Sequence, residues 1–148
     1  MKPSSNLPHA TMRNAFSLLE LLIVIVILGL LIAVVAPGLM DRADQAKHDT
    51  VCLKMDDLKK RLDMFKLDNG TYPDTEEGFE ALLSNPDEDK YPGYPVKPYL
   101  KKLPKDAWRT PFVYINKGDD VEIISLGADR KQGGEGSGQD ILFSQCNK

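Results

Sequence analysis

FSLLELLIVIVILGLLIAVVAPGLM, residues 16–40, is the stretch that decides the fold of this chain. Its last twenty residues, 21–40, contain no charged side chain. At ~1.5 Å of rise per residue, a helix of that length extends about 30 Å, roughly the thickness of a membrane hydrocarbon core. A helix in the core of a soluble protein keeps a polar face, and this stretch has none. The sequence therefore predicts a single membrane-spanning helix here.

Glu20 is the one acidic residue within this stretch. A carboxylate inside a membrane costs at least ~2.5 kcal/mol on insertion scales, so we expect Glu20 to need a cationic partner. The small residue Ala15 stands directly before the apolar run. If a peptidase cleaves after Ala15, the new amine of Phe16 becomes the nearest cation that can pair with Glu20. We expect Glu20 to act in assembly through this pairing.

Residues 1–15 have the composition of a cytoplasmic leader. They contain Lys2 and Arg13 but no acidic residue. Under the positive-inside rule this places the leader in the cytoplasm. Residues 41–148 are then expected on the periplasmic side of a bacterial inner membrane, anchored by one span.

The helix is expected to continue beyond the membrane, from residue 16 to about residue 66. Apolar residues recur there at steps of three and four, which indicates a helix with one buried stripe. The stripe consists of Val51, Met55, Leu58, Leu62 and Phe65. Pro37 lacks a backbone N–H, so we expect a bend or local melting over residues 33–38.

The rest of the chain predicts a small α+β domain. The long helix should end at residues 68–70, where Asn and Gly favour helix termination. A short helix capped by Thr75 should follow and stop at residues 85–86. Two β-rich runs, residues 111–115 and 121–126, predict a small antiparallel sheet that packs against the long helix.

Composition excludes several classes of function. With 19 basic and 22 acidic residues the net charge is −3, and no basic stretch interleaves with aromatic residues as in nucleic-acid-binding proteins. No phosphate-binding glycine loop or nucleophile motif is present in the sequence, so we expect no enzyme. About 108 residues remain after the leader and the span, which is enough for one domain.

The N-terminal residues resemble the processing signature of type IV pilins and pseudopilins. The signature consists of Arg13-Asn14-Ala15, then FSLLE at residues 16–20, then an apolar run that contains Pro37. The resemblance implies that a prepilin peptidase cleaves between Ala15 and Phe16 and methylates the new amine. The family usually has Gly before the cleaved bond, and Ala15 departs from that pattern.

The later part of the chain resembles the major pseudopilins of type II secretion systems. The matching landmarks are Tyr72-Pro73, TEEG at 75–78, LPKD at 103–106 with Trp108, and SLGAD at 125–129. The resemblance implies a homopolymer, the periplasmic pseudopilus, that drives export of folded proteins through the outer membrane. It implies three further partners: the prepilin peptidase, the minor pseudopilins and an inner-membrane assembly platform. Ala107 and Arg109 replace the Pro and Gly that usually flank this Trp, whose expected role is to anchor the domain by packing.

The loop LGADRKQGGEGSGQDI, residues 126–141, is the one candidate metal site. Calcium prefers six to eight oxygen ligands on a turning backbone, and this loop combines carboxylates with glycines. Composition alone is a weak signal, because acidic glycine-rich loops are common on protein surfaces. The resemblance implies one calcium, with ligands at Leu126 (backbone carbonyl), Asp129, Gln139 and Asp140. Glu135 is the alternative to Gln139 as the remaining ligand.

Two alternatives remain open at the level of function. One is a type IV pilin or competence pseudopilin, and the other is a signal-anchored calcium-binding protein that never polymerises. The state of Cys52 and Cys146 is also open, because a disulfide and two unpaired thiols fit the sequence equally well. His48 is expected to have no chemical role.

Overall fold

The chain folds in two parts, and the helix α1 runs through both. A computed structural model describes residues 16–146, and contacts divide the chain into Met1–Met40 and Asp41–Lys148. In chain order the elements are α1 (Leu18–Asn69), the 3-10 helix η1 (Gly78–Leu82), the strands β1 (Val113–Asn116) and β2 (Val121–Ser125), the 3-10 helix η2 (Gly136–Gly138), the strand β3 (Ile141–Leu142) and the helix α2 (Phe143–Cys146).

The prediction of one long helix is confirmed, because α1 comprises 52 residues without interruption. The window Leu18–Val35 has a mean hydropathy of 3.3 and no buried residue, so α1 is long and apolar enough there to cross a membrane. The backbone stays helical over residues 33–38, so the expected melting near Pro37 does not occur. A proline inside a helix removes one hydrogen bond, and the remaining bonds of the ladder maintain the helix.

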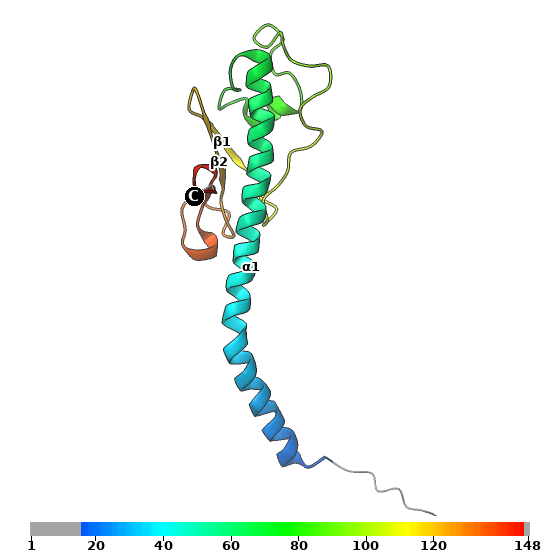
Figure 1. Cartoon of the computed structure of the whole chain (residues 1–148), viewed down its shortest axis with the longest axis vertical. Helices are drawn as coiled ribbons and strands as arrows, with labels where there is room; N and C mark the ends of the chain where they lie inside the picture. The colour runs from blue at the N-terminus through cyan, green and yellow to red at the C-terminus, as the bar shows by residue number, and fades with distance from the viewer. Residues whose placement is uncertain (1–15, 147–148) are drawn as a thin grey trace, which may run out of the picture. The chain divides into compact units, whose positions relative to one another are not determined.

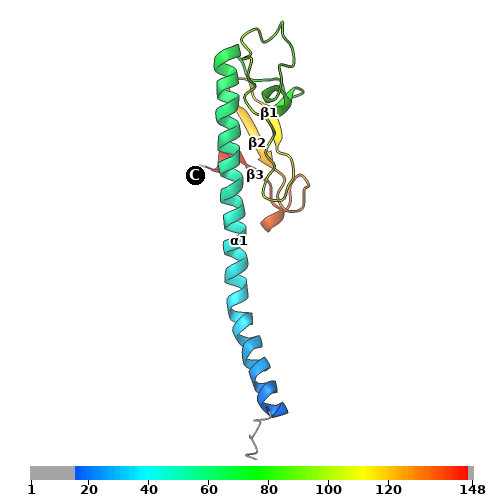
Figure 2. The same ribbon diagram turned by 90° about the vertical axis from the view of Figure 1, so that its right-hand side faces the viewer.

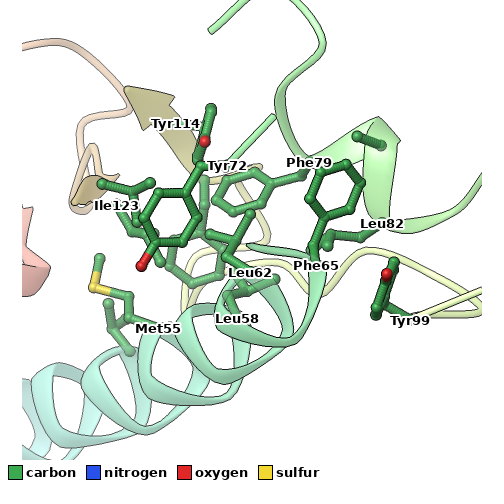
Figure 3. Close-up of a cluster of buried hydrophobic side chains, with 14 of the residues drawn as sticks. Met55, Leu58, Leu62, Phe65, Tyr72, Phe79, Leu82, Tyr99, Tyr114 and Ile123 are labelled. Atoms are coloured by element: carbon green, nitrogen blue, oxygen red, sulfur yellow. The ribbon is translucent and has the colours of Figure 1, made fainter. Parts of the chain in front are cut away.

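The second half of α1 supplies one side of the domain core. All five residues of the predicted stripe are fully buried. Figure 3 shows Met55, Leu58, Leu62 and Phe65 pointing from α1 toward Tyr72, Phe79 and Ile123. The helix ends as predicted, with Gly70 in the left-handed region at φ +83° and its N–H bonded to the carbonyl of Lys66 at 2.7 Å.

The sheet has three antiparallel strands in the order β1-β2-β3. It lies beside the second half of α1 in two perpendicular views (Figures 1 and 2). β1 pairs with β2 from Val113↔Ile124 to Asn116↔Val121, and β2 pairs with β3 at Ser125↔Ile141. The sequence predicts the first two strands within a few residues. It does not predict β3, because two residues are too few for a periodic pattern.

The short helix differs from the predicted one. η1 is a 3-10 helix that begins after Glu77, and Thr75 does not cap it. The Thr75 hydroxyl instead accepts a hydrogen bond from the backbone N–H of Asn116 on β1, at 3.1 Å. A bond to a distant strand has replaced the local cap, which is a tertiary effect that propensity cannot anticipate.

Candidate functional site

The residues predicted for processing and assembly lie at the start of α1. Ala15 lies outside the described residues. Phe16 is exposed just before α1 begins, and Glu20 lies in the first turn of the helix, also exposed. Every apolar side chain of the window Leu18–Val35 is likewise exposed. This surface has the composition of one covered by lipid or by other apolar helices.

The candidate calcium loop, residues 126–140, is closed at its base by strand pairing. It leaves β2 after Ser125 and enters β3 at Ile141, and these two residues are partners in the sheet. Inside the loop, the N–H of Ala128 bonds to the carbonyl of Ser137 at 2.9 Å. The loop is therefore a folded unit whose two ends are held together.

Asp140 has one carboxylate oxygen that is satisfied and one that is not. Its Oδ2 accepts a hydrogen bond from the N–H of Gly133 at 2.9 Å, and its own N–H donates to the Gly133 carbonyl at 3.2 Å. Its Oδ1 is buried and has no hydrogen-bond partner within the described part of the chain. A buried carboxylate oxygen without a partner is costly, and a bound cation would satisfy it.

Asp129 lies against glycines of the same loop. Its Oδ1 accepts a hydrogen bond from the N–H of Lys131 at 3.0 Å. A Cβ added to Gly134 would lie 3.0 Å from Asp129 Oδ2 and 2.4 Å from the carbonyl oxygen of Gly138. A Cβ added to Gly138 would lie 3.2 Å from the same Oδ2. The glycines thus let the backbone approach this carboxylate more closely than any other residue would allow.

The other predicted ligands are less clearly placed. Glu135 and Gln139 are exposed, and Leu126 is partly buried. Over residues 16–146, no three Asp, Glu, His or Cys side chains come close enough to share one metal ion. Asp129, Glu135 and Asp140 therefore do not form a cluster of three carboxylates in the described structure. Asp129 and Asp140 are the two carboxylates that hydrogen bonds within the loop hold in place.

Asp106 is a buried hydrogen-bond acceptor that joins two segments of the domain, a role that the sequence does not predict. Its side chain is buried, and its Oδ1 accepts hydrogen bonds from the N–H groups of Trp108 (2.9 Å) and Thr110 (2.7 Å). Its Oδ2 accepts a bond at 2.7 Å from the hydroxyl of Ser125, the residue directly before the candidate calcium loop. An Asp that bonds the N–H two residues ahead is a common turn pattern, so this part was predictable. The bond to Ser125 was not.

Trp108 packs partly buried against the core, the anchoring role expected from the sequence. The turn that carries it places Arg109 in the left-handed region, at φ 66°. The resemblance to major pseudopilins of type II secretion leads one to expect Gly at this point, and Gly adopts that conformation without steric cost. The bonds to Asp106 hold the turn although Arg109 lacks that freedom.

The two cysteines, which the sequence leaves open, are joined in the structure. Cys52 of α1 and Cys146 of α2 form a disulfide, with Cα atoms 5.5 Å apart and a sequence separation of 94. The bond attaches the C-terminal end of the chain to α1. Both cysteines pack partly buried against the core.

Comparison with known protein families identifies the family of this chain. A model of the family described as type II secretion system (T2SS), protein G matches residues 38–144, well over half of the chain. A prokaryotic N-terminal methylation motif matches residues 11–36. The chain belongs to the type II secretion system protein G family.

Relatives in this family match over most of their length. The type II secretion system core protein G of Vibrio cholerae is 40% identical over 131 residues, which is 87% of this chain and 90% of that protein. The core protein G of Pseudomonas aeruginosa is 42% identical over 132 residues, 87% of this chain and 93% of that protein.

A solved structure agrees with the fold. The crystal structure of the major pseudopilin from the type 2 secretion system of enterohaemorrhagic Escherichia coli is 34% identical, with a TM-score of 0.64. The match covers 72% of this chain and 93% of the chain in that crystal structure. The protein G family consists of structural pseudopilin subunits and is not a family of enzymes. The predicted fold and family are therefore confirmed.

Proposed function

We propose that this chain is the major subunit of a pseudopilus that drives the export of folded proteins through the outer membrane of its bacterium. The observation that carries the proposal is the protein G family match over residues 38–144, preceded by the methylation motif. In this proposal α1 holds the subunit in the inner membrane, with residues 41–148 in the periplasm. An assembly platform then moves the subunit into the filament, together with the minor pseudopilins.

Glu20 has the central part in this mechanism. Its carboxylate lies in the first turn of α1, within the apolar and exposed window Leu18–Val35, where an unpaired charge is costly in lipid. Pairing with the Phe16 amine of a neighbouring copy neutralises both charges. The apolar side chains of α1 then pack against those of other copies, so the packed helices form the core of the filament. The chain supplies no energy source of its own, and a cytoplasmic ATPase must drive growth.

Deletion of the gene tests this function against its alternatives. A pseudopilin deletion should abolish release of secreted enzymes while twitching motility and DNA uptake continue. Loss of twitching or DNA uptake with normal secretion would instead establish a type IV pilin or competence pseudopilin. A chain that gives no ladder of cross-linked multimers in membranes would be a non-polymerising anchored protein.

Processing gives the first specific prediction. Co-expression with an active prepilin peptidase should give a mature chain that begins at N-methylated Phe16. Ala15 has the small size that a cleavage site needs, and intact mass spectrometry reads the product directly. A matched variant, Phe16→Asp, should remain uncleaved. An intact mass that retains residues 1–15 in the presence of the peptidase would refute the assignment.

We also propose that the loop of residues 126–140 binds one calcium ion. Two observations support it: the buried, unpartnered Oδ1 of Asp140, and the glycine backbone that closes around Asp129. Asp129, Asp140 and the carbonyl of Leu126 would hold the ion, with Gln139 or Glu135 completing the site. Bound calcium would supply positive charge that neutralises the two carboxylates and stabilises the loop.

Calcium should therefore raise the melting temperature of the full-length chain in detergent. A ligand that binds only the folded state at a hundredfold excess over its Kd adds about 2.7 kcal/mol of stability. Magnesium should have a smaller effect, because it requires a tighter octahedron and keeps its waters. Asp129→Asn and Asp140→Asn should each abolish the calcium shift, and Glu135→Gln compared with Gln139→Ala identifies the remaining ligand.

The control for these variants is Glu76→Gln, an exposed carboxylate outside the loop, which should keep the full shift. Equal melting of the unmodified chain in calcium and in chelator would show that the loop binds no ion. That outcome would leave the pseudopilin assignment intact, since the assignment rests on the family match.

A further inference from the structure

The disulfide lies next to a histidine that has no part in the functions proposed above. The Sγ atom of Cys52 lies 3.9 Å from Nδ1 of His48, within hydrogen-bonding distance for sulfur. The other sulfur, that of Cys146, lies 3.9 Å from the thioether sulfur of Met55, a core residue. The two sulfurs of the disulfide thus have different contacts, an imidazole for Cys52 and a thioether for Cys146.

The contact between Cys52 and His48 belongs to α1 itself. The two residues are four apart in one helix and so lie on the same face, one turn from each other. This neighbourhood exists before the disulfide forms, because it needs only the helix. The approach of Cys146 needs the whole domain to fold, since the two cysteines are 94 positions apart in sequence. In the reduced chain, therefore, Cys52 has this imidazole one helical turn away before Cys146 arrives.

An imidazole beside a thiol favours the thiolate, which is the form that attacks disulfides. The thioether of Met55, which contacts Cys146, has no basic nitrogen and gives no such activation. His48 is also accessible to solvent, with 43% of its side chain exposed. An external reagent can therefore reach this side of α1.

We propose that Cys52 is the nucleophile that begins oxidation of this chain, and that His48 activates it. The Cys52 thiolate attacks one sulfur of an external disulfide, forming a mixed disulfide and releasing the other sulfur as a thiolate. Cys146, after losing its proton to solvent, attacks Sγ of Cys52 and expels the second sulfur of the reagent. The two cysteines are oxidised by two electrons, and the external disulfide is reduced to two thiols.

The acceptor is thus a molecule that carries an exchangeable disulfide, either a small one such as oxidised glutathione or one on a thiol-oxidising protein. The reaction fixes the C-terminal segment, because α2 follows β3 directly and ends at Cys146. The step does not depend on the calcium proposal, and its test needs no metal.

The first experiment compares the two cysteines in the reduced full-length chain, held in detergent with chelator. Cys146→Ser leaves only the activated thiol, and Cys52→Ser leaves only the other. Oxidised glutathione should modify the Cys146→Ser chain at least about threefold faster, measured by intact mass. A tenfold higher thiolate fraction is partly offset by the lower nucleophilicity of a more acidic thiol, which leaves about a threefold gain. Equal rates, or a faster Cys52→Ser chain, would overturn the proposal.

The second experiment isolates His48. Other charged groups face it: Asp49, whose Oδ1 lies 3.7 Å from His48 Nδ1, and Asp44 and Asp140, which line the same hollow of about 390 Å3. In the Cys146→Ser background, the rate of alkylation by iodoacetamide is measured against pH. His48→Ala and His48→Asn should each move this profile about one pH unit toward alkaline values and slow glutathionylation about threefold.

Lys47 lies over the Trp108 ring, with its Nζ 5.9 Å from the ring centroid. Lys47→Ala removes a charge from the same helical turn as His48 and is therefore the matched control. Its profile should not move. An unchanged profile in both His48 variants, with unchanged helicity measured by circular dichroism, would overturn the role of His48.

In cells, the Cys146→Ser chain should carry an adduct on Cys52, and the mass of the adduct distinguishes glutathione from a protein oxidant. An adduct found only on Cys146 of the Cys52→Ser chain would refute the assignment.

Discussion

Gly93 illustrates, at the scale of single residues, how closely the loops pack on the end of α1. A Cβ at this position would lie 2.1 Å from the backbone oxygen of Asp68, in the last turn of the helix. Such a distance is impossible without backbone movement. The sequence marks this region only as a proline-containing loop, and the close approach is a tertiary feature.

Gly93→Ala should therefore destabilise the domain by about 1–3 kcal/mol, the range for overpacking. Chemical denaturation of the full-length chain in detergent measures the loss. Gly118→Ala is the comparison, because Gly118 has open space around it but a φ of +86°. It should cost about 1 kcal/mol through backbone strain alone. A Gly93→Ala chain as stable as the unmodified one would contradict the packing described here.

Glu20 gives the second prediction at this scale. Glu20→Gln and Glu20→Ala should insert into the membrane as well as the unmodified chain, because both remove a charge from an apolar helix. Filament assembly should decrease strongly, since the partner of the Phe16 amine is lost. Cross-linking of membranes followed by electrophoresis measures the multimer ladder, with Ser17→Ala as the control. Normal assembly of Glu20→Ala would remove the case for this ion pair.

At the scale of elements, Glu122 connects the sheet to the C-terminal helix. It is buried on β2, where its Oε2 accepts a bond from Lys117 Nζ at 2.7 Å and its Oε1 accepts one from the N–H of Ser144 at 3.0 Å. Burial alone would raise the pKa of Glu122, but the bonds from Lys117 and Ser144 outweigh it and hold this pKa below 4.5, its ordinary value.

A carboxylate with a lowered pKa stabilises the folded state above its unfolded pKa, and this contribution is lost as the pH falls through the folded pKa. We therefore expect the free energy of unfolding to decrease below about pH 4.5. Glu122→Gln should cost about 1.5–3 kcal/mol at pH 7, the range for hydrogen bonds to a charged group, and should weaken the acid dependence. Denaturant titrations at pH 7 and pH 3 in chelator measure both effects.

Glu76→Gln, at an exposed position, is the control and should leave the stability at pH 7 and its acid dependence nearly unchanged. Glu77 and Asp63 also have lowered pKa values, because the bonds from Lys90 and Tyr91 to Glu77, and those from Lys59 and Tyr72 to Asp63, outweigh burial. Some acid sensitivity should therefore survive in Glu122→Gln. An identical pH dependence in the two chains would exclude Glu122 as a contributor.

At the scale of the whole molecule, the part from residue 41 onward is a small domain whose C-terminal segment is cross-linked to α1. The disulfide between Cys52 and Cys146 closes a loop of nearly the whole domain. In the chain-entropy account, cross-links that close long loops stabilise the most. The proposed calcium would bind the loop of residues 126–140, which precedes Cys146. The disulfide and the calcium ion would therefore both stabilise the C-terminal segment of the domain.

The sequence by itself determined the apolar segment that is long enough to cross a membrane, the approximate length of α1 and the buried stripe from Val51 to Phe65. These features depend on composition and on periodicity along one element, which a linear pattern records in full. The family resemblance likewise rested on short contiguous motifs, and the family match confirms it. The end of α1 at Gly70 was predictable for the same reason, because helix termination is local.

Only the tertiary structure decided which distant groups meet. It placed Asp106 against Ser125, joined Cys52 to Cys146, and left one oxygen of Asp140 buried with no partner among residues 16–146. It also gave Thr75 a partner on β1 in place of a helix cap. Each of these outcomes depends on a contact between segments far apart in the chain. Local propensity does not encode such contacts, because they arise only when the sheet and loops pack on α1.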